Sequence, residues 1–207
     1  MPVVGLTGGI ASGKSTVCGF FQAAGARILD ADQMARQVVM PGEPAWRAIV
    51  DHFGKSILKP DGALDRAALG EIVFRDKMQR TVLEGIIHPR VRQAMIAATA
   101  HLSSAEPGCL IIQDVPLLLE TGMHRNQGLA EIIVVYLPET VQIERLIKRD
   151  GINREQALRR VRAQMPMEEK RKLATIVIDN SGNLDQTQDQ VRQIHRRLKA
   201  ISEAGQV

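Results

Sequence analysis

The sequence predicts an α/β fold in which a parallel five-stranded sheet carries helices on both faces. Three observations lead to this prediction. Short, almost continuously apolar runs alternate with longer segments of helical spacing, as strands and crossover helices do in parallel sheets. The first apolar run leads directly into a glycine-rich loop, and a helical pattern follows that loop. The expected strands are residues 3–7, 26–29, 109–113, 132–136 and 175–178.

The loop after the first strand fits the pattern G-x-x-x-x-G-K-[ST] from Gly8 to Ser15. Glycines in such a loop let backbone N–H groups converge on phosphate oxygens, and the following helix directs its positive end at the same anion. Lys14 is expected to reach the β- and γ-phosphates of a nucleoside triphosphate, and Ser15 to offer its hydroxyl to Mg²⁺. A glycine-rich turn without a ligand is the alternative. The residues expected to hold the triphosphate are Ala11, Ser12, Gly13, Lys14, Ser15 and Thr16.

The helix after the loop is expected to run from about Lys14 to Ala24 and to end at Gly25, a typical C-terminal capping residue. The second strand, 26–29, then delivers Asp30 and Asp32 at its carboxyl end. Ligands of open α/β sheets bind beyond the carboxyl ends of the strands. Both carboxylates are therefore expected on the rim that carries the phosphate loop.

Residues 33–104 show helical spacing interrupted by proline- and glycine-containing turns. This pattern predicts several short helices inserted between the second and third strands. Asp65 is a candidate N-cap, and His88-Pro89 is expected to open a longer helix with Pro89 near its first position. By fold-level analogy, such an insertion closes over a second substrate.

Asp114 follows the third strand, where a protein with a phosphate loop places its magnesium-associated carboxylate. A plain turn aspartate is the alternative.

After the fourth strand come two basic helical segments separated by Gly151, and Asn153 with Gln156 resembles a capping box. These helices would form a mobile lid that brings arginine side chains onto phosphates. The alternative is that the arginines form a basic helix face exposed to solvent. A fifth strand leads into the turn 179–183. The helix after this turn is expected to pack against the rest of the domain and to have no role in catalysis.

The amino-acid composition limits the partners and the compartment that we expect for this protein. The chain has 207 residues, with 27 Lys and Arg against 23 Asp and Glu. The resulting charge of +4 suits an anionic ligand, while an aromatic content of 3% leaves little material for stacking bases, so we expect no nucleic acid partner. Cys18 and Cys109 are expected to be buried, reduced thiols in a cytoplasmic protein. No signal-peptide pattern and no membrane-length apolar run occurs in the sequence, so no membrane partner is expected.

Three classes of phosphate-loop protein can be compared with this sequence. A guanine-nucleotide switch normally has Asp-x-x-Gly after its acidic strand and an Asn-Lys-x-Asp turn, and neither fits here, since the acidic strand continues as Asp114-Val115-Pro116-Leu117. A motor or nucleic-acid ATPase is usually larger and takes an arginine from a neighbouring subunit. A small-molecule kinase needs two substrate pockets and a lid, which matches the length and the two helical insertions.

Further segments resemble the dephospho-CoA kinase family over nearly the whole chain. Besides the loop, they include Asp30-Ala31-Asp32, His88-Pro89 and the run from Asp114 to Glu120. They continue with Arg145 through Asp150, Gln164 and Ile178 to Gly182. Ala11 is often Gly in the family and Leu119 is often Phe; neither departure removes a polar group.

The resemblance implies a reaction of ATP with dephospho-CoA to give ADP and CoA, by transfer of the γ-phosphoryl group to the ribose 3′-hydroxyl. Mg²⁺ is the implied cofactor, held by Ser15 and, through water, by Asp114. Asp32 is expected to accept or orient the hydroxyl proton. The other expected catalytic residues are Lys14, Arg149 and, as second choice, Arg145. The turn of Asn180 and Gly182 is expected to contact the ATP base; a plain strand-to-helix turn is the alternative. The acceptor side is expected to include Thr7, Asp32, His88, Asp114 and Leu117. For His88, a structural hydrogen bond at a helix start is the alternative.

These expectations give one kinase domain over residues 1–207. Its core is 1–32, 105–140 and 173–207, its acceptor-binding insertion is 33–104, and its lid is 141–172. We expect a monomer, with a small homo-oligomer as the alternative. Two other activities stay open: a nucleoside or nucleotide kinase of similar architecture, and a nucleotide-dependent regulator or nucleic-acid-associated ATPase.

Overall fold

The computed structural model describes residues 3–125 and 128–204. The chain divides into two compact units, which are described separately. The first unit comprises the residues up to Leu29 and those from His101 onward, and the second is Asp30–Ala100. The second unit has nearly the bounds of the predicted insertion 33–104, while the acceptor-binding role of this unit remains a prediction.

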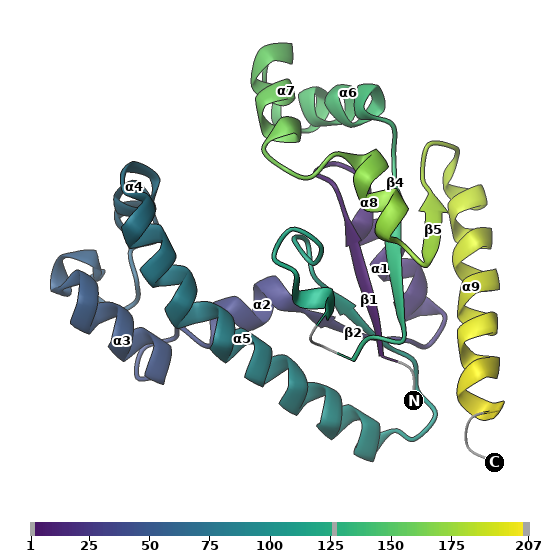
Figure 1. The fold of residues 1–207 in the computed structure, drawn as a ribbon, viewed down its shortest axis with the longest axis horizontal. Helices are drawn as coiled ribbons and strands as arrows, with labels where there is room; N and C mark the ends of the chain where they lie inside the picture. The colour runs from purple at the N-terminus through teal and green to yellow at the C-terminus, as the bar shows by residue number, and fades with distance from the viewer. Residues whose placement is uncertain (1–2, 126–127, 205–207) are drawn as a thin grey trace. The chain divides into compact units, whose positions relative to one another are not determined.

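The described residues of the first unit and Asp30 form the predicted five-stranded sheet (Figure 1), in the order β2-β3-β1-β4-β5. β1 pairs in parallel with β3 and with β4, and β4 pairs in parallel with β5. The register places Leu6 beside Asp114, so the loop after β1 and the end of β3 leave the sheet at neighbouring points. The strand bounds are β1 Val3–Gly8, β2 Arg27–Asp30, β3 Ile111–Asp114, β4 Glu131–Tyr136 and β5 Ile176–Asp179.

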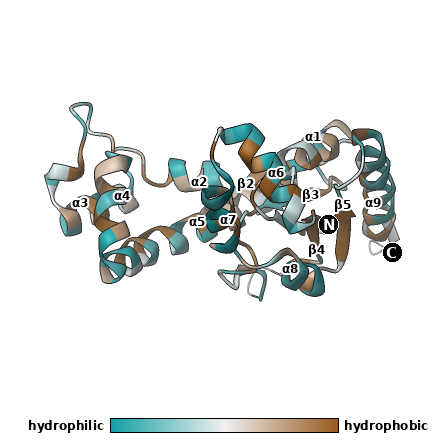
Figure 2. Cartoon of the chain, turned by 90° about the horizontal axis from the view of Figure 1, so that it is seen from above, coloured by the Kyte–Doolittle hydropathy of each residue, from teal (hydrophilic) through white to brown (hydrophobic). Residues whose placement is uncertain are grey.

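Helices cover both faces of this sheet, as predicted. Side chains alternate between the faces of a strand. Ile133 and Val135 of β4 therefore share a cluster with Phe21 of α1 and with α9, whereas Val134 packs on the opposite face with Met167 of α8. In Figure 2 β5 is brown and hydrophobic beside α9, which carries much teal. The helices of this unit are α1 Lys14–Ala23, α6 Glu139–Asp150, α7 Arg154–Arg162, α8 Met167–Leu173 and α9 Leu184–Ala204, with a 3₁₀ turn at Met123–Arg125.

The predicted helix signals of the first unit are present. Gly25 follows α1 at a φ of 99°, and Gly151 ends α6 in the left-handed conformation. Asn153 and Gln156 form both hydrogen bonds of a capping box at the start of α7. The predicted lid segment 141–172 also includes α8, which the spacing of apolar residues did not separate. Because Met167 of α8 is buried against the sheet, this last part belongs to the packed core.

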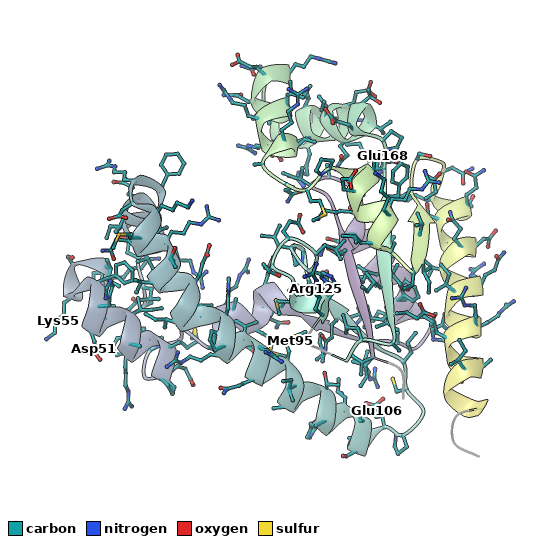
Figure 3. All side chains as sticks on the ribbon, viewed as in Figure 1. Asp51, Lys55, Met95, Glu106, Arg125 and Glu168 are labelled. Carbon is teal, nitrogen blue, oxygen red and sulfur yellow. The ribbon has the colours of Figure 1, made fainter. Side chains whose placement is uncertain are left out.

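The boundary that departs furthest from the prediction is the start of the third strand. β3 begins at Ile111, so Cys109 precedes the strand and is only half-buried, contrary to the expectation of two buried thiols. Cys18 is buried, and both cysteines are free of disulfides. Just after α5, both carboxylate oxygens of Glu106 (labelled in Figure 3) accept from the single Nε–H of Arg27, at 3.0 and 2.9 Å, which ties this helix end to β2. Within the ranges that the structure describes, no helix is both long and apolar enough to cross a bilayer.

The second unit has its own apolar core, built around Ile49, Ile57 and Leu69. Its helices are α2 Ala31–Gln37, α3 Pro44–Phe53, the 3₁₀ turn Lys55–Ile57, α4 Arg66–Arg75 and α5 Lys77–Ala105, whose last residues belong to the first unit.

The prediction for His88-Pro89 is wrong, because both residues lie inside α5. The helix starts earlier, where the carboxylate of Asp76 accepts hydrogen bonds from the N–H groups of Met78 and Gln79. A proline inside a helix removes one backbone hydrogen bond and normally marks a boundary. One turn of this helix also carries a side-chain contact, since the guanidinium of Arg90 donates to O of Ile86 at 2.7 Å.

Asp65 caps α4 as predicted, since its Oδ1 accepts from the N–H groups of Ala67 and Ala68 at 2.9 and 3.1 Å. We expect Asp65→Ala to lower the free energy of unfolding by about 0.5–2 kcal/mol, because two N–H groups of the first turn lose their acceptor. Urea titration followed by circular dichroism measures this loss. Asp65→Asn keeps the acceptor oxygen and should unfold like wild type; equal losses in the two variants would contradict the capping role.

Candidate active site

The loop between β1 and α1 needs its glycines for steric reasons. Gly13 has a φ of 86°, and a Cβ there would lie 2.1 Å from Nδ2 of Asn180. A Cβ on Gly8 would lie 2.6 Å from Oγ of Ser12. Both ends of the loop therefore exclude a side chain, and the N–H of Ser12 closes the loop by donating to O of Gly9 at 3.1 Å.

The start of α1 is suited to an anion. Its N-cap is Gly13, which offers no side-chain acceptor to the first turn. The first N–H groups of a helix have no partner within the helix, and together with the helix dipole they attract phosphate. Ser15 and Thr16 of this turn are exposed. The predicted phosphate-binding residues thus form a continuous loop and helix start.

Lys14 and Asp114 form an ion pair, with 2.5 Å between Nζ and Oδ1. The side chains are 17% and 9% exposed, so the pair lies largely out of solvent. The thiol of Cys18, one helical turn after Lys14, donates to Oδ2 of Asp114 at 3.4 Å. Both oxygens of this carboxylate are therefore engaged, and the lysine is held at the mouth of the loop. The contact of Cys18 was not predicted.

Asn180 connects three elements around the loop. Its Nδ2 donates to O of Ser12 at 2.7 Å, and its Oδ1 accepts from Oγ1 of Thr187 at 2.8 Å. Nη2 of Arg145 donates to O of Asn180 at 2.9 Å. The structure therefore brings Arg145 and Asn180 to the loop, with the Asn180 amide buried and bound at both ends. Gly182, two residues later, is exposed. Contact of this turn with the ATP base remains a prediction.

Arg149 lies at the end of α6 and is paired with its neighbour Asp150. Its Nε and Nη2 donate to the two carboxylate oxygens at 2.7 and 3.2 Å, and Arg160 of α7 donates to the same carboxylate at 2.7 Å. The hydrogen bond from Arg149 holds the pKa of Asp150 below its ordinary value. Arg149 itself is more than half exposed. In this structure the predicted catalytic arginine is therefore joined to α6 and α7, and its contact with phosphate is a prediction.

Thr7 and Leu117 were predicted on the acceptor side and have different environments. The hydroxyl of Thr7 is buried and donates to O of Pro116 at 2.9 Å, which anchors the segment after β3. Leu117 in that segment is 42% exposed, unlike its buried neighbour Leu118. The hydroxyl of Thr7 thus has a structural partner, whereas Leu117 is available for contact.

Two predicted residues, Asp32 and His88, belong to the second unit. Asp30 caps α2, since its Oδ1 accepts from the N–H groups of Asp32 and Gln33 at 2.8 and 3.0 Å. The side chain of Asp32 is exposed in the first turn of this helix. His88 is exposed on α5. The structure thus separates the two early aspartates into a capping carboxylate and an exposed one, and acceptor contacts of Asp32 and His88 stay predictions.

The residues predicted to hold Mg²⁺ provide oxygen ligands, as this ion requires. Ser15 offers an exposed hydroxyl, and Asp114 a carboxylate beside the loop. Within the described part of the chain, no group of three or more His, Cys, Asp or Glu residues is placed to hold a metal ion. Mg²⁺ in nucleotide sites is usually held by one or two protein ligands together with phosphates and water. The donor set therefore fits a metal that is held jointly with the nucleotide.

Sequence reasoning gave no role to two amides that contact the loop. Gln142 of α6 and Gln164 after α7 both hydrogen-bond to the backbone of Ile10. Gln164 was noted only through the family resemblance. A signal for Gln142 exists in the sequence: it lies four residues before Leu146, on the apolar face of a helix, where a polar residue needs a buried partner.

Comparisons with known proteins identify the family of the chain. A family model described as dephospho-CoA kinase matches residues 2–186. A dephospho-CoA kinase of Carboxydothermus hydrogenoformans is 47% identical over 199 residues, which are 96% of this chain and 95% of the relative. One from Oryza sativa is 44% identical and covers 96% of this chain and 85% of the relative.

Solved structures show the same similarity. A protein of Thermus thermophilus superposes with a TM-score of 0.79 at 34% identity, covering 95% of this chain and 97% of the other. Dephospho-CoA kinase from Campylobacter jejuni gives a TM-score of 0.74 at 27% identity, covering 96% and 97%. The family match over most of the chain and the relatives above 40% identity lead to one conclusion: the chain belongs to the dephospho-CoA kinase family.

Proposed function

We propose that this chain transfers the γ-phosphoryl group of ATP to the ribose 3′-hydroxyl of dephospho-CoA, with Lys14 on the donor side and Asp32 on the acceptor side. Phosphorylation of dephospho-CoA follows from the family. What we propose beyond the family is the role of each residue in this reaction. The observation that carries them is the Lys14–Asp114 pair at the mouth of a glycine-shaped phosphate loop.

The donor side uses the backbone and one cation. N–H groups from Ala11 to Thr16 bind the phosphate oxygens, except that of Ser12, which donates to O of Gly9 and closes the loop. Lys14 stabilises the charge on the β- and γ-phosphates. Asp114 holds the ammonium group close to the loop before ATP arrives, so little side-chain entropy is lost on binding. Arg145 and Arg149 add positive charge as the phosphoryl group leaves, since a loose transition state spreads its charge over three oxygens.

On the acceptor side, Asp32 orients the 3′-hydroxyl and accepts its proton. Its carboxylate is exposed and lies two residues after the end of β2, which agrees with ligand binding beyond strand ends. Ser15 and Asp114 would hold Mg²⁺, which when bound offsets phosphate charge. The buried hydroxyl of Thr7 shapes the segment that carries Leu117, and His88 faces the acceptor.

A coupled assay of ADP release tests this proposal. Purified protein with ATP and dephospho-CoA should release ADP and form CoA, while adenosine, nucleoside monophosphates and RNA should leave the rate at background. Mass spectrometry locates the new phosphate on the ribose. Stimulation by RNA together with no response to dephospho-CoA would contradict the proposal and favour the ATPase alternative.

The same proposal includes a monomeric enzyme that works in the cytoplasm. Its two cysteines, neither of which forms a disulfide, agree with a reducing compartment. Light scattering at assay concentration measures the mass directly; a stable dimer would change the expected stoichiometry, although not the reaction.

A further inference from the structure

Two glutamine side chains bind the backbone of Ile10, at the tip of the phosphate loop. Nε2 of Gln142 donates to O of Ile10 at 2.9 Å, and Oε1 of Gln164 accepts from N–H of Ile10 at 2.7 Å. The roles of the two amide groups are fixed, because a backbone N–H must donate and a carbonyl must accept. Gln142 is buried. We propose that these two residues, named here the Ile10 clamp, position the phosphate loop for ATP.

The clamp controls the direction of a phosphate-binding N–H group. The peptide bond between Ile10 and Ala11 is planar and trans, as are all peptide bonds of the described residues. In a trans peptide the C=O and N–H bonds point in opposite directions. A hydrogen bond that fixes O of Ile10 therefore also fixes N–H of Ala11, the first of the N–H groups proposed to bind ATP.

The conformation of Ala11 shows that this peptide needs such support. Ala11 has a φ of 59°, and among the described residues it is the only one other than glycine with a positive φ. Alanine rarely adopts this left-handed conformation, and it persists only where neighbouring contacts determine it. The hydrogen bond from Gln142 is attached to the peptide directly before Ala11 and supplies one such contact.

The surroundings of the clamp are built to let the glutamines approach. A Cβ on Gly9 would lie 2.3 Å from Nε2 of Gln142 and 2.7 Å from Sδ of Met167, so only glycine leaves the amide its place. The side chains of Ile10 and Ala11 pack against the apolar cluster of α6 and α7.

A second set of contacts supports Gln164. The N–H of the next residue, Met165, donates to Oε1 of Glu120 at 3.3 Å, and the same oxygen pairs with Lys170 at 2.6 Å. Lys170 lies on α8, whose Glu168 (labelled in Figure 3) accepts a hydrogen bond from Tyr136 of β4. The segment after α7 is thus attached to the core, so Gln164 has a fixed base from which to bind the loop.

The two amides come from opposite ends of the α6–α7 pair, since Gln142 lies near the start of α6 and Gln164 two residues after α7. They touch the loop backbone and no reacting atom, so they are positioning residues. This inference rests on the ATP-binding role proposed above. Wild-type protein is therefore titrated first by calorimetry with an ATP analogue whose γ-phosphate cannot be transferred; absence of binding there would overturn the proposed function before the clamp is tested.

The test makes the same substitution at both positions. Gln142→Glu replaces the donor by an oxygen that faces O of Ile10, whereas Gln164→Glu keeps an acceptor for N–H of Ile10. Both add one negative charge near the loop, and high salt reduces that shared effect. We expect Gln142→Glu to weaken binding of the ATP analogue about tenfold or more, because it loses the hydrogen bond to O of Ile10. Gln164→Glu should weaken binding by less than about threefold, because the hydrogen bond from N–H of Ile10 is kept. The KM for dephospho-CoA should stay near that of wild type in both.

A second pair of variants separates positioning from folding. Gln142→Met and Gln164→Met remove the hydrogen bonds without charge, and a cavity of about 110 Å³ lined by both glutamines gives the new side chains room. Each should fold, by circular dichroism, and bind the analogue a few-fold more weakly. Equal losses in the two Glu variants, or wild-type binding by both Met variants, would overturn the clamp.

Discussion

Replacing Lys14 by methionine is expected to lower kcat/KM for ATP by about 10³-fold, the range in which a cation that stabilises a transferring phosphoryl group acts. Methionine replaces the methylene chain of lysine by an unbranched chain of the same number of atoms and removes the ammonium group. The loss should appear in kcat as well as in KM, because phosphate charge grows at this position in the transition state. Steady-state ADP release at saturating dephospho-CoA measures both constants.

The Lys14–Asp114 pair complicates this variant, and a double variant resolves it. Methionine at position 14 leaves Asp114 largely buried without its cation, which destabilises the fold. Adding Asp114→Asn removes the unpaired charge and should restore the unfolding temperature, which shows that the lost stability comes from the carboxylate. Because Asp114 is itself proposed to hold Mg²⁺, turnover is compared in the single variant, at a temperature at which it is folded. Lys172→Met is the matched control, because that lysine is 69% exposed and pairs only on the surface with Glu169. Near-normal turnover of Lys14→Met would contradict the role of Lys14.

Asp32→Asn is expected to lower kcat by at least about 10²-fold, within the range of a general base, and to leave ATP affinity nearly unchanged. The amide keeps the shape and loses both the negative charge and the capacity to accept the hydroxyl proton. Single-turnover transfer to dephospho-CoA measures the chemical step apart from product release. Binding of the ATP analogue, measured by calorimetry, checks the donor side.

Asp30→Asn is the control that the structure provides. Asp30 accepts hydrogen bonds from two N–H groups of α2, and asparagine caps a helix equally well, so this variant should turn over like wild type. If Asp30→Asn were the slow variant and Asp32→Asn the normal one, the assignment of the two carboxylates would have to be exchanged.

The periodicity of the sequence was sufficient to predict the sheet and the loop. Strands of continuous apolar residues and a loop of fixed glycine spacing are local patterns, and the structure has them within two residues. Local capping signals were equally reliable at Asp65 and at Asn153. The pairing of Lys14 with Asp114 was not predicted, although both were expected at the site, because it depends on the register between β1 and β3.

Other features depend on contacts that no local pattern contains. Proline favours the first turn of a helix, so Pro89 predicts a helix start. In the structure α5 runs through Pro89, and Asp76 caps the helix earlier. Cys18 and Gln142 carry no motif, and their partners are distant in sequence. Contact of Asp32, His88, Arg149 and Gly182 with substrates remains a prediction, since it concerns bound ligands and, for two of them, the second unit.

The loop that opens this chain is completed by residues translated long after it. Its contacts with Gln142, Gln164 and Asn180 span 132, 154 and 168 positions of sequence. Such distant pairs raise the contact order of the nucleotide site and delay its formation relative to local helices. During synthesis Asn180 leaves the ribosome 168 residues after Ser12 of the loop. The glycine motif is therefore synthesised well before the residues that support it. A chain truncated before Asn180 would contain the complete motif but lack contacts that complete the ATP site.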